Sequence, residues 1–419
     1  MEKKNINQIT WKKALKFIPT GNMFLSKNPS RFIKNIWPTY FHKSEGCKVW
    51  DLNNKKYFDL SLMGVGTNVL GYTNPKIEKA VMQVLKKGNM TTLNCPEEVE
   101  LAKQLVEIHP WANMARFAKT GGETNAIAVR LARTYTKKNI ILICGYHGWH
   151  DWYLSANLIN KNRLDTHLFK DLKFEGIPSN LKGTTYTFKY NDISTFEKLI
   201  KKYKGKIAAV KMEVQREVAP KKNFLKKIRS ITKRNGILLI FDECTTGFRE
   251  YFGGLHLKYR VYPDLVMYGK ALGNGYPITA LLGRKEIMKC AEKTFISSTF
   301  WSDRIGTTAG LATLKEMKRI KSWIKVKKIG KKVKNKINII AKQNNINISF
   351  KGMDSLITFE IIEKNPEKIY KYITKRMLQF GFLAKNSIYI STSHNDKILR
   401  KYFKCLSVVF KELSIKNFK

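Results

Sequence analysis

The sequence predicts an α/β protein with a mostly parallel central sheet packed between helices. Several strand-length runs in the middle of the chain are rich in branched and aromatic residues and almost continuously apolar, as expected of strands buried on both faces of such a sheet. These runs are residues 140–144, 207–212, 237–241 and 265–268. Amphipathic stretches separate them. One stretch, residues 224–235, carries apolar side chains at helical spacing and ends before Gly236, a typical helix stop.

The two ends of the chain follow another pattern. Near the N-terminus, residues 46–51 and 56–60 flank two asparagines and predict a β-hairpin. From about residue 310 the chain is lysine-rich with helical periodicity. Short predicted strands follow at 356–359 and 387–390, before a final helix from about Asp396.

These patterns predict two domains. We expect residues 66–309 to form a large α/β domain, and residues 1–65 and 310–419 to form the two parts of one smaller α+β domain. A chain of 419 residues is long enough for two or three domains and for a large core without disulfides.

The composition excludes disorder and disfavours a nucleic-acid binder. Hydrophobic residues make up 43% of the chain and aromatic residues 12%, enough apolar area to offset chain entropy. The net charge of +46 comes from 63 lysines and only 15 arginines, spread along the whole chain. Base readout and phosphate clamps favour clustered arginine. A solvated basic surface is therefore favoured over a polyanion-binding site.

The cysteine pattern and the N-terminus predict a soluble cytoplasmic protein. Six cysteines are far apart, without a CxxC pair or a nearby histidine that would complete a zinc pattern, so we predict reduced thiols and no metal site. Residues 1–4 do not begin a signal peptide, and no apolar run approaches the roughly 18 residues that span a bilayer. We expect no membrane partner.

A glycine turn at residues 120–125 precedes an amphipathic helix. The sequence Thr-Gly-Gly-Glu-Thr-Asn is followed by apolar residues at helical spacing. Free backbone N–H groups at such a helix start attract anions, typically phosphate. The alternative is an ordinary helix N-terminus.

Two charged residues follow predicted buried strands. Asp242 comes directly after the run ending at Phe241, where a carboxylate is costly unless a metal, an arginine or a protonated ring nitrogen pairs with it. A helix N-cap is the alternative. Lys270 follows the run 263–269 and enters a glycine-rich turn that lets a ring approach closely.

A phosphate cradle, a buried aspartate and a strand-end lysine are together what a pyridoxal 5′-phosphate site requires. The lysine amine binds the cofactor, the aspartate keeps the ring nitrogen protonated, and the helix start holds the phosphate. In open parallel sheets such ligands bind at the carboxyl ends of the strands.

Six motifs resemble those of the class III pyridoxal-phosphate aminotransferases of fold type I, closest to the glutamate-1-semialdehyde 2,1-aminomutase branch. The resemblance covers nearly the whole chain. The motifs are residues 46–51 (Gly-Cys-Lys-Val-Trp-Asp), 71–75 (Gly-Tyr-Thr-Asn-Pro), 116–123 (Arg-Phe-Ala-Lys-Thr-Gly-Gly-Glu), 146–151 (Tyr-His-Gly-Trp-His-Asp), 241–249 (Phe-Asp-Glu-Cys-Thr-Thr-Gly-Phe-Arg) and 263–277.

The resemblance implies a role for each matching residue. Lys270 would be the Schiff-base lysine and Asp242 the partner of the pyridinium nitrogen. The remaining cofactor-binding residues would be Gly121 and Gly122 at the phosphate, Tyr146 stacked on the ring, His147 beside it, the cofactor-side Glu213, and Thr299. Threonines matching Thr299 reach the phosphate of the neighbouring subunit, which implies a homodimer with shared active sites.

The chain departs from the family pattern at several positions. Gly122 and Thr124 stand where relatives usually carry Ser or Thr and Ala, and Val214 replaces a usual proline. Trp301 and Arg304 replace small residues and imply an altered pocket wall. We expect Arg304 or Arg249 to hold a substrate carboxylate or phosphate, whereas Arg216 has no predicted role.

Two departures, the altered pocket wall at Trp301 and Arg304 and a packed segment at about 153–182, favour a transaminase that moves an amino group between a donor and a carbonyl acceptor. The alternative is an aminomutase, which must retain its intermediate under a closing lid. The segment where that lid would lie, about 153–182, holds few glycines and many bulky side chains, so it is predicted to be packed. The bulky side chains of the segment are Tyr153, Leu158, Ile159, His167, Leu168 and Phe169, and Trp152 directly precedes it. A remote alternative is a basic polyanion-binding protein on an inactive scaffold.

Overall fold

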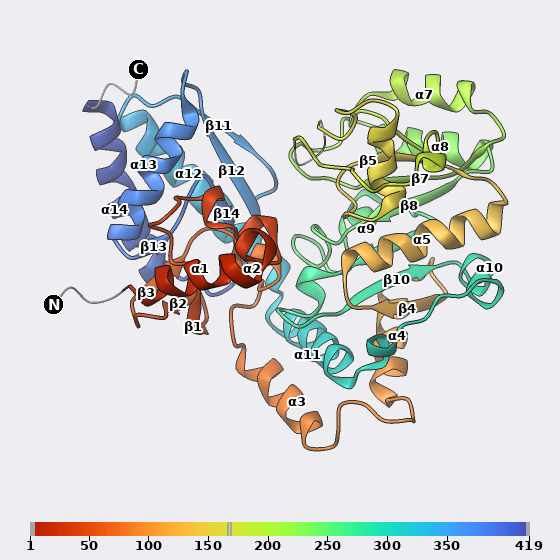
Figure 1. The fold of residues 1–419 in the computed structure, drawn as a ribbon, viewed down its shortest axis with the longest axis horizontal. Helices are drawn as coiled ribbons and strands as arrows, with labels where there is room; N and C mark the ends of the chain where they lie inside the picture. The colour runs from red at the N-terminus through yellow and green to blue at the C-terminus, as the bar shows by residue number, and fades with distance from the viewer. Residues whose placement is uncertain (1–4, 166, 168–169, 416–419) are drawn as a thin grey trace. The chain divides into compact units, whose positions relative to one another are not determined.

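The computed structural model describes residues 5–165, 167 and 170–415, and divides the chain into two compact units (Figure 1). The large unit comprises residues 79–318. The small unit combines the residues up to Glu78 with those from Arg319 onward. Two helices continue across the unit boundaries: α3 (Pro75–Leu85) and α11 (Arg304–Ile320).

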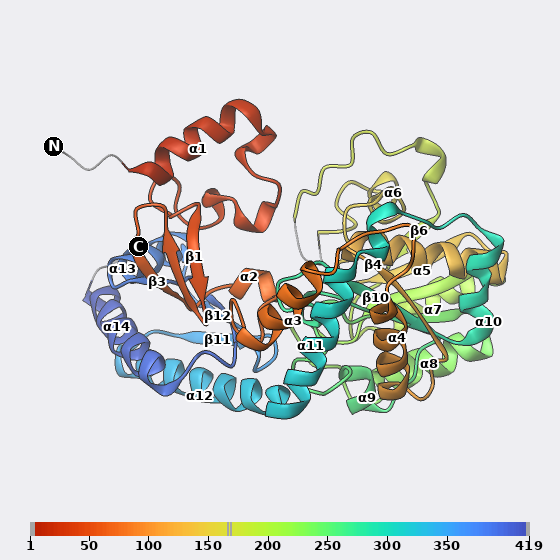
Figure 2. The ribbon, with the colours of Figure 1, turned by 90° about the horizontal axis from the view of Figure 1, so that it is seen from below.

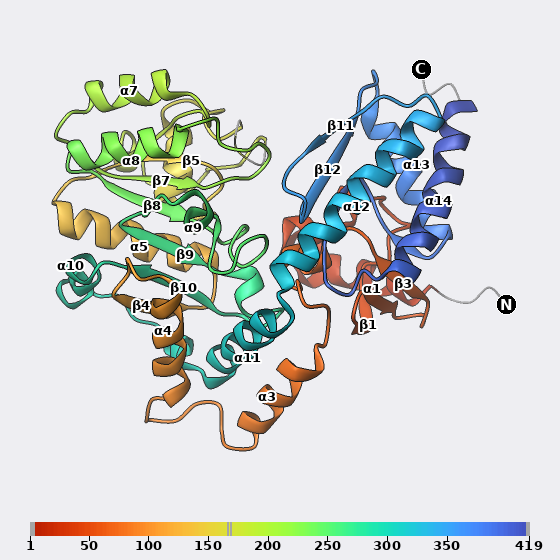
Figure 3. The same ribbon diagram turned by 180° about the vertical axis from the view of Figure 1, so that it is seen from behind.

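A seven-stranded sheet in the order β4-β10-β9-β8-β7-β5-β6 lies within the large unit. Figure 3 labels its strands from β4 to β5. The strands are β4 (Met114–Ala118), β5 (Ile140–Cys144), β6 (Thr185–Thr187), β7 (Ile207–Glu213), β8 (Leu238–Asp242), β9 (Leu265–Tyr268) and β10 (Thr279–Gly283). Strand β10 is antiparallel to both neighbours, and the other pairs are parallel. Six strands therefore end at the same edge of the sheet.

Helices connect these strands and cover the sheet (Figure 2). They are α4 (Pro96–Ile108), α5 (Gly121–Thr136), α6 (Asp151–Leu154), α7 (Ile193–Lys202), α8 (Phe224–Arg234), α9 (Leu255–Tyr259) and α10 (Lys285–Met288). Helix α5 packs on β4, β7, β8, β9 and β10. Its buried face, with Ile127, Ala128 and Leu131, joins Ile240 and Met267 of the sheet in one apolar core. The core fixes where α5 begins, and thereby where its N-terminus lies.

The small unit contains two short sheets and the helices α1 (Ile6–Phe17), α2 (Met63–Gly66), α12 (Ser322–Gln343), α13 (Pro366–Gln379) and α14 (Asp396–Ile415). One sheet has the order β1-β2-β3-β13 and the other β11-β12-β14. Their bounds are β1 (Phe41–Glu45), β2 (Lys48–Asp51), β3 (Lys56–Asp59), β11 (Ile348–Lys351), β12 (Leu356–Ile361), β13 (Phe382–Leu383) and β14 (Ser387–Tyr389). Strand β13 pairs with β3, so the two ends of the chain meet.

The predicted α/β class with a mostly parallel sheet is confirmed, and the four central runs are β5, β7, β8 and β9. The predicted hairpin is β2–β3, and the final helix begins at Asp396. Strands β4, β6 and β10 were not predicted. No helix in the described part of the chain is long and apolar enough to cross a membrane.

Candidate active site

The Asp242 carboxylate is buried at the end of β8 and hydrogen-bonded on both oxygens. His147 Nδ1 donates to Asp242 Oδ2 at 2.8 Å, and the Cys244 backbone N–H donates to Oδ1 at 3.1 Å. Burial opposes ionisation, but the His147 hydrogen bond and the Lys211 charge outweigh it and hold the pKa of Asp242 well below its usual range. Asp242 is therefore an anion that still has acceptor capacity for a cationic ring nitrogen.

His147 is held by its neighbours so that one ring nitrogen faces Asp242. Asn125 of α5 donates to its backbone carbonyl at 3.0 Å, and the His147 ring is stacked against Trp152. Because a carboxylate only accepts, Nδ1 carries the proton in this pair. Nε2 is buried and has no hydrogen-bond partner among the described residues. The His147 ring is thus a buried hydrogen-bond donor that fixes the position of the Asp242 carboxylate.

Lys270 begins a single 3₁₀ turn directly after β9. Its backbone φ of 45° lies in the left-handed region, which is strained for a residue with a Cβ. Gly269 precedes it, and a Cβ there would lie 2.9 Å from Cys244 Sγ. The amine Nζ donates to Thr245 Oγ1 at 2.7 Å, from the segment that follows Asp242. The structure therefore brings Lys270 and the segment after β8 together.

The first turn of α5 begins with the two predicted glycines. Thr120 caps the helix: its Oγ1 accepts from the Glu123 N–H, and the Glu123 carboxylate accepts from the Thr120 N–H in a capping box. The helix itself supplies no acceptor for the N–H groups of Gly121 and Gly122. A Cβ at Gly122 would lie 2.5 Å from His150 Cε1, so a larger residue here requires the His150 ring to move. Two N–H groups are left for an anion.

Glu213 and Tyr146 meet at the ends of β7 and β5. The Tyr146 N–H donates to Glu213 Oε2 at 3.2 Å, and Arg216 pairs with Glu213 Oε1 at 2.8 Å. The Tyr146 ring lies edge-on to Tyr153 at 5.9 Å. Arg216, for which the sequence predicted no role, is thus a counter-ion of a predicted site residue.

Thr299 is exposed in a 3₁₀ turn just before α11. Two residues later, Trp301 Nε1 donates to Glu123 Oε1 at 3.1 Å and ties this turn to the start of α5. The bulky Trp301 therefore stabilises the N-terminus of α5.

The two arginines expected to hold a substrate anion are engaged within the protein. Arg304 forms a two-pronged ion pair with Glu97, with N–O distances of 2.8 and 2.9 Å. Arg249 is 1% exposed, and its Nε donates to the Thr245 carbonyl. The geometry therefore does not support the hypothesis that either presents a free guanidinium to a substrate.

The first part of the segment at 153–182 is packed against the core. Tyr153 and Leu164 are fully buried. Asn157 accepts from the Leu164 N–H and donates to the Leu172 carbonyl. Residues 166, 168 and 169 lie outside the described residues, so Leu168 and Phe169 are not placed.

A buried polar layer beneath the strand ends was not predicted. Glu243 is fully buried and accepts from His256 Nδ1 at 2.7 Å and from two backbone N–H groups. Beside it, Tyr268 of β9 donates to His109 Nε2 at 2.7 Å, and His109 Nδ1 donates to the Leu105 carbonyl. This layer fixes the strand that carries Lys270. The residues of this layer are distant in sequence. The only sequence feature that could have indicated it is the Glu243 carboxylate directly after the apolar run of β8.

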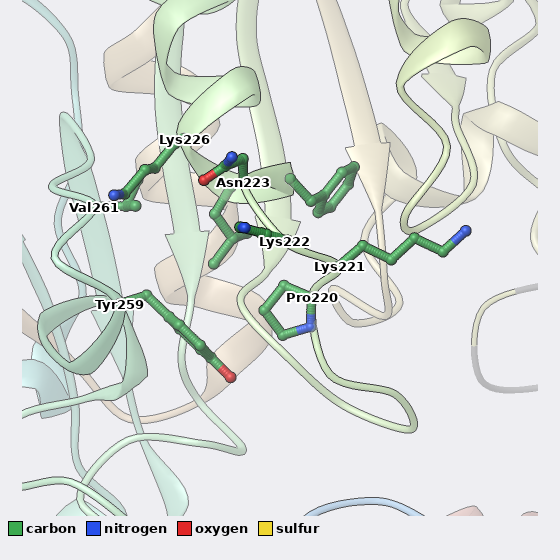
Figure 4. A pocket seen from close by; sticks show the side chains of 9 residues that line it. Pro220, Lys221, Lys222, Asn223, Lys226, Tyr259 and Val261 are labelled. Atoms are coloured by element: carbon green, nitrogen blue, oxygen red, sulfur yellow. The ribbon is translucent and has the colours of Figure 1, made fainter.

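A pocket of about 160 Å³ lies at the start of α8 (Figure 4). It is lined by Pro220, Lys221, Lys222, Asn223, Phe224, Leu225, Lys226, Tyr259 and Val261. None of the predicted site residues belongs to it. The chemistry-bearing residues instead gather at the ends of β5, β7, β8 and β9.

Comparison with known proteins gives the class of this chain. The family model for class-III aminotransferases matches residues 33–400. A 3-aminobutyryl-CoA aminotransferase of Cloacimonas acidaminovorans is 30% identical over 94% of this chain and 91% of that protein. A glutamate-1-semialdehyde 2,1-aminomutase of Methanocaldococcus jannaschii is 34% identical over 92% of this chain and 94% of that protein.

Solved structures agree on the fold. The FumI protein of Sphingopyxis sp. MTA144 superimposes with a TM-score of 0.87 at 22% identity, over 97% of this chain and 96% of that chain. An omega-transaminase of Sphaerobacter thermophilus gives 0.86 at 20% identity, over 99% of both chains. The chain belongs to the class III aminotransferase family. It is therefore an enzyme, and the predicted cofactor, pyridoxal 5′-phosphate, is that of its family.

The burial of His109 predicts a loss of stability in mild acid. Burial, followed by the charge of His256, lowers the pKa of His109 from 6.5 to about 4. Between these values the unfolded chain binds a proton that the folded chain does not, so stability falls as the pH drops from about 6.5 toward 4. The loss from this residue is about 3 kcal/mol.

We expect His109→Gln to flatten the decline of the unfolding midpoint over this range, measured by circular dichroism. His42→Gln, an exposed histidine of β1, is the control and keeps the wild-type slope. An unchanged slope in His109→Gln contradicts this interpretation.

Proposed function

We propose that this enzyme transfers an amino group from an amino donor to a separate carbonyl acceptor, at a site formed by the carboxyl ends of β5, β7, β8 and β9. The observation that carries the proposal is the pairing of two unusual residues. Asp242 is a buried anion at the end of β8, and Lys270 is an amine after the neighbouring β9. Lys270 Nζ donates to Thr245, three residues after Asp242. A lysine and a buried aspartate in this arrangement suit pyridoxal phosphate chemistry.

The residues fit the cofactor in three respects. Asp242 keeps lone pairs free for a protonated ring nitrogen. Gly121 and Gly122 offer N–H groups at the positive end of α5 to a phosphate. Tyr146 and His147 are the aromatic residues proposed to contact the ring, and Glu213, which orders the Tyr146 backbone, borders it.

When bound, pyridoxal phosphate supplies an electrophilic carbon and an electron-withdrawing ring. Lys270 Nζ would hold the cofactor covalently at rest and, once released, take a proton from the amine-bearing carbon of the donor and later return one to the acceptor. Thr245 Oγ1 keeps the amine on its strand end. Asp242, fixed by His147, would hold the ring nitrogen in its protonated form.

Transfer between two molecules is favoured over an intramolecular shift by the rigidity of the site. Tyr153 and Leu164 anchor the segment where a lid would lie, and Trp301 is hydrogen-bonded to Glu123 at the start of α5. An aminomutase needs to retain its intermediate by closure. Several relatives are named glutamate-1-semialdehyde 2,1-aminomutases, so that activity is the second candidate.

The acceptor requirement separates the two candidates. We expect the protein, loaded with pyridoxamine phosphate, to return to the pyridoxal form only when an oxo acid or aldehyde is added, measured by absorbance. Conversion of glutamate-1-semialdehyde without a second carbonyl compound would establish the aminomutase instead.

Lys270→Ala is expected to abolish the visible absorption band of the bound cofactor and to lower turnover by about 100-fold or more, because both covalent binding and proton transfer are lost. Lys226→Ala, an exposed lysine of α8, is the control and keeps both. A normal band in Lys270→Ala rules out the assigned role.

We further propose a homodimer in which Thr299 reaches the partner's cofactor. Apolar side chains are exposed beside Thr299: Phe300 is 66% exposed and Phe295 83%. Leu93, 81% exposed, belongs to the segment that Arg304 ties to this turn through the Asn89 carbonyl. Six free cysteines favour a reducing, cytoplasmic location.

Phe300→Asp is expected to weaken the dimer at least about 10-fold, because it places a charge in an apolar contact. Light scattering after size exclusion measures the change. Ile362→Asp, an exposed apolar residue of the small unit, should leave the dimer intact. A monomeric, cofactor-loaded wild type is the result that defeats this proposal.

A further inference from the structure

Lys211 is a lysine inside the core of the large unit. It lies in the centre of β7 and its side chain is 0% exposed. Its Nζ contacts the sulfur of Met267 at 3.8 Å, a weak acceptor. A buried ammonium is costly without a counter-charge. Neither the predicted site nor the proposed mechanism gives this residue a task.

The strand register places Lys211 under Asp242. Lys211 pairs with Ile240, and Glu213, two residues on, pairs with Asp242, so these side chains share one face of the sheet. Met267, which Lys211 contacts, is the β9 partner of Asp242. The ammonium therefore lies on the Asp242 side of the sheet, beneath α5.

Charge balance couples Lys211 to Asp242. The charged or titratable groups that act on Lys211 are Asp242, Cys244 and Glu213, and burial lowers the pKa of Lys211 to about 8 against their attraction. Glu213 already has Arg216 as its counter-ion. His147 contributes a hydrogen bond to Asp242 from Nδ1. An ionised Asp242 and a protonated Lys211 therefore carry equal and opposite charges in the same buried region.

We propose that Lys211 is the resident counter-cation of Asp242 and loses its proton to solvent when a protonated pyridine ring binds at that carboxylate. Two cations cannot share one buried anion without cost. The departing proton keeps the net charge around Asp242 unchanged. Lys211 is thus a positioning residue that links cofactor binding to pH, and the inference rests on the proposed role of Asp242.

Calorimetric proton counting tests this link. The full-length chain, freed of cofactor, is titrated at about pH 7 with 4′-deoxypyridoxine 5′-phosphate, which keeps the ring nitrogen and phosphate but has no aldehyde. Runs in two buffers of different ionisation enthalpy give the protons released. We expect wild type to release about one proton more than Lys211→Met. At about pH 9.5, where Lys211 is already neutral, the difference disappears.

Lys206→Met, an exposed lysine just before β7, is the matched control and releases as many protons as wild type. Lys211→Gln replaces Lys211→Met if the latter does not fold. Equal proton release by wild type and both Lys211 variants overturns the role of Lys211. Failure of wild type to bind the probe instead contradicts the proposed cofactor site, and removes the basis of this inference.

Discussion

Burying the Asp242 carboxylate at the end of β8 is costly unless donors and cations surround it. The large unit supplies both: His147 and the Cys244 backbone donate to its oxygens, and Lys211 brings a positive charge from below. Each comes from a different element: His147 follows β5, Cys244 follows β8, and Lys211 lies within β7. This one carboxylate therefore requires β5, β7 and β8 to lie in fixed positions relative to one another. The same arrangement leaves a buried anion that can bind a cationic ring.

The sheet makes this convergence possible because six of its strands end at one edge. Helix α5 adds its N-terminus there, held by the capping box and by Trp301. Beneath the edge, Glu243 with His256 and Tyr268 with His109 satisfy the buried polar groups. These buried contacts hold the strand before Lys270 in place, so the strained backbone of Lys270 is maintained by its surroundings, as expected of a functional residue.

Much of the fold could be predicted because buried parallel strands leave continuous apolar runs, as in residues 140–144 and 265–268. Strand β4 was missed because Arg116 interrupts its short apolar pattern, and β10 because it follows the glycine-rich turn after Lys270. Asp242 and Lys270 were singled out because charge at the end of a buried strand is unusual. The Arg304–Glu97 pair joins residues 207 apart, and no local pattern signals such a contact.

Few of the basic residues behind the net charge of +46 take part in the proposed chemistry. Most of the lysines are exposed, whereas Lys211 and Lys270 are placed by strands β7 and β9. Their different surroundings explain different tasks: Lys211 is sealed against Met267, and Lys270 Nζ is presented by a strained turn beside Thr245. Environment, and not abundance, selects the functional amine.

Borohydride reduction of the cofactor-loaded protein, followed by peptide mapping with mass spectrometry, tests the central claim most directly. It reports which of the 63 lysines carries the cofactor. The account predicts one pyridoxyl phosphate group per chain, on Lys270. A label on another lysine, or no covalent label on a protein that binds the cofactor, would contradict it.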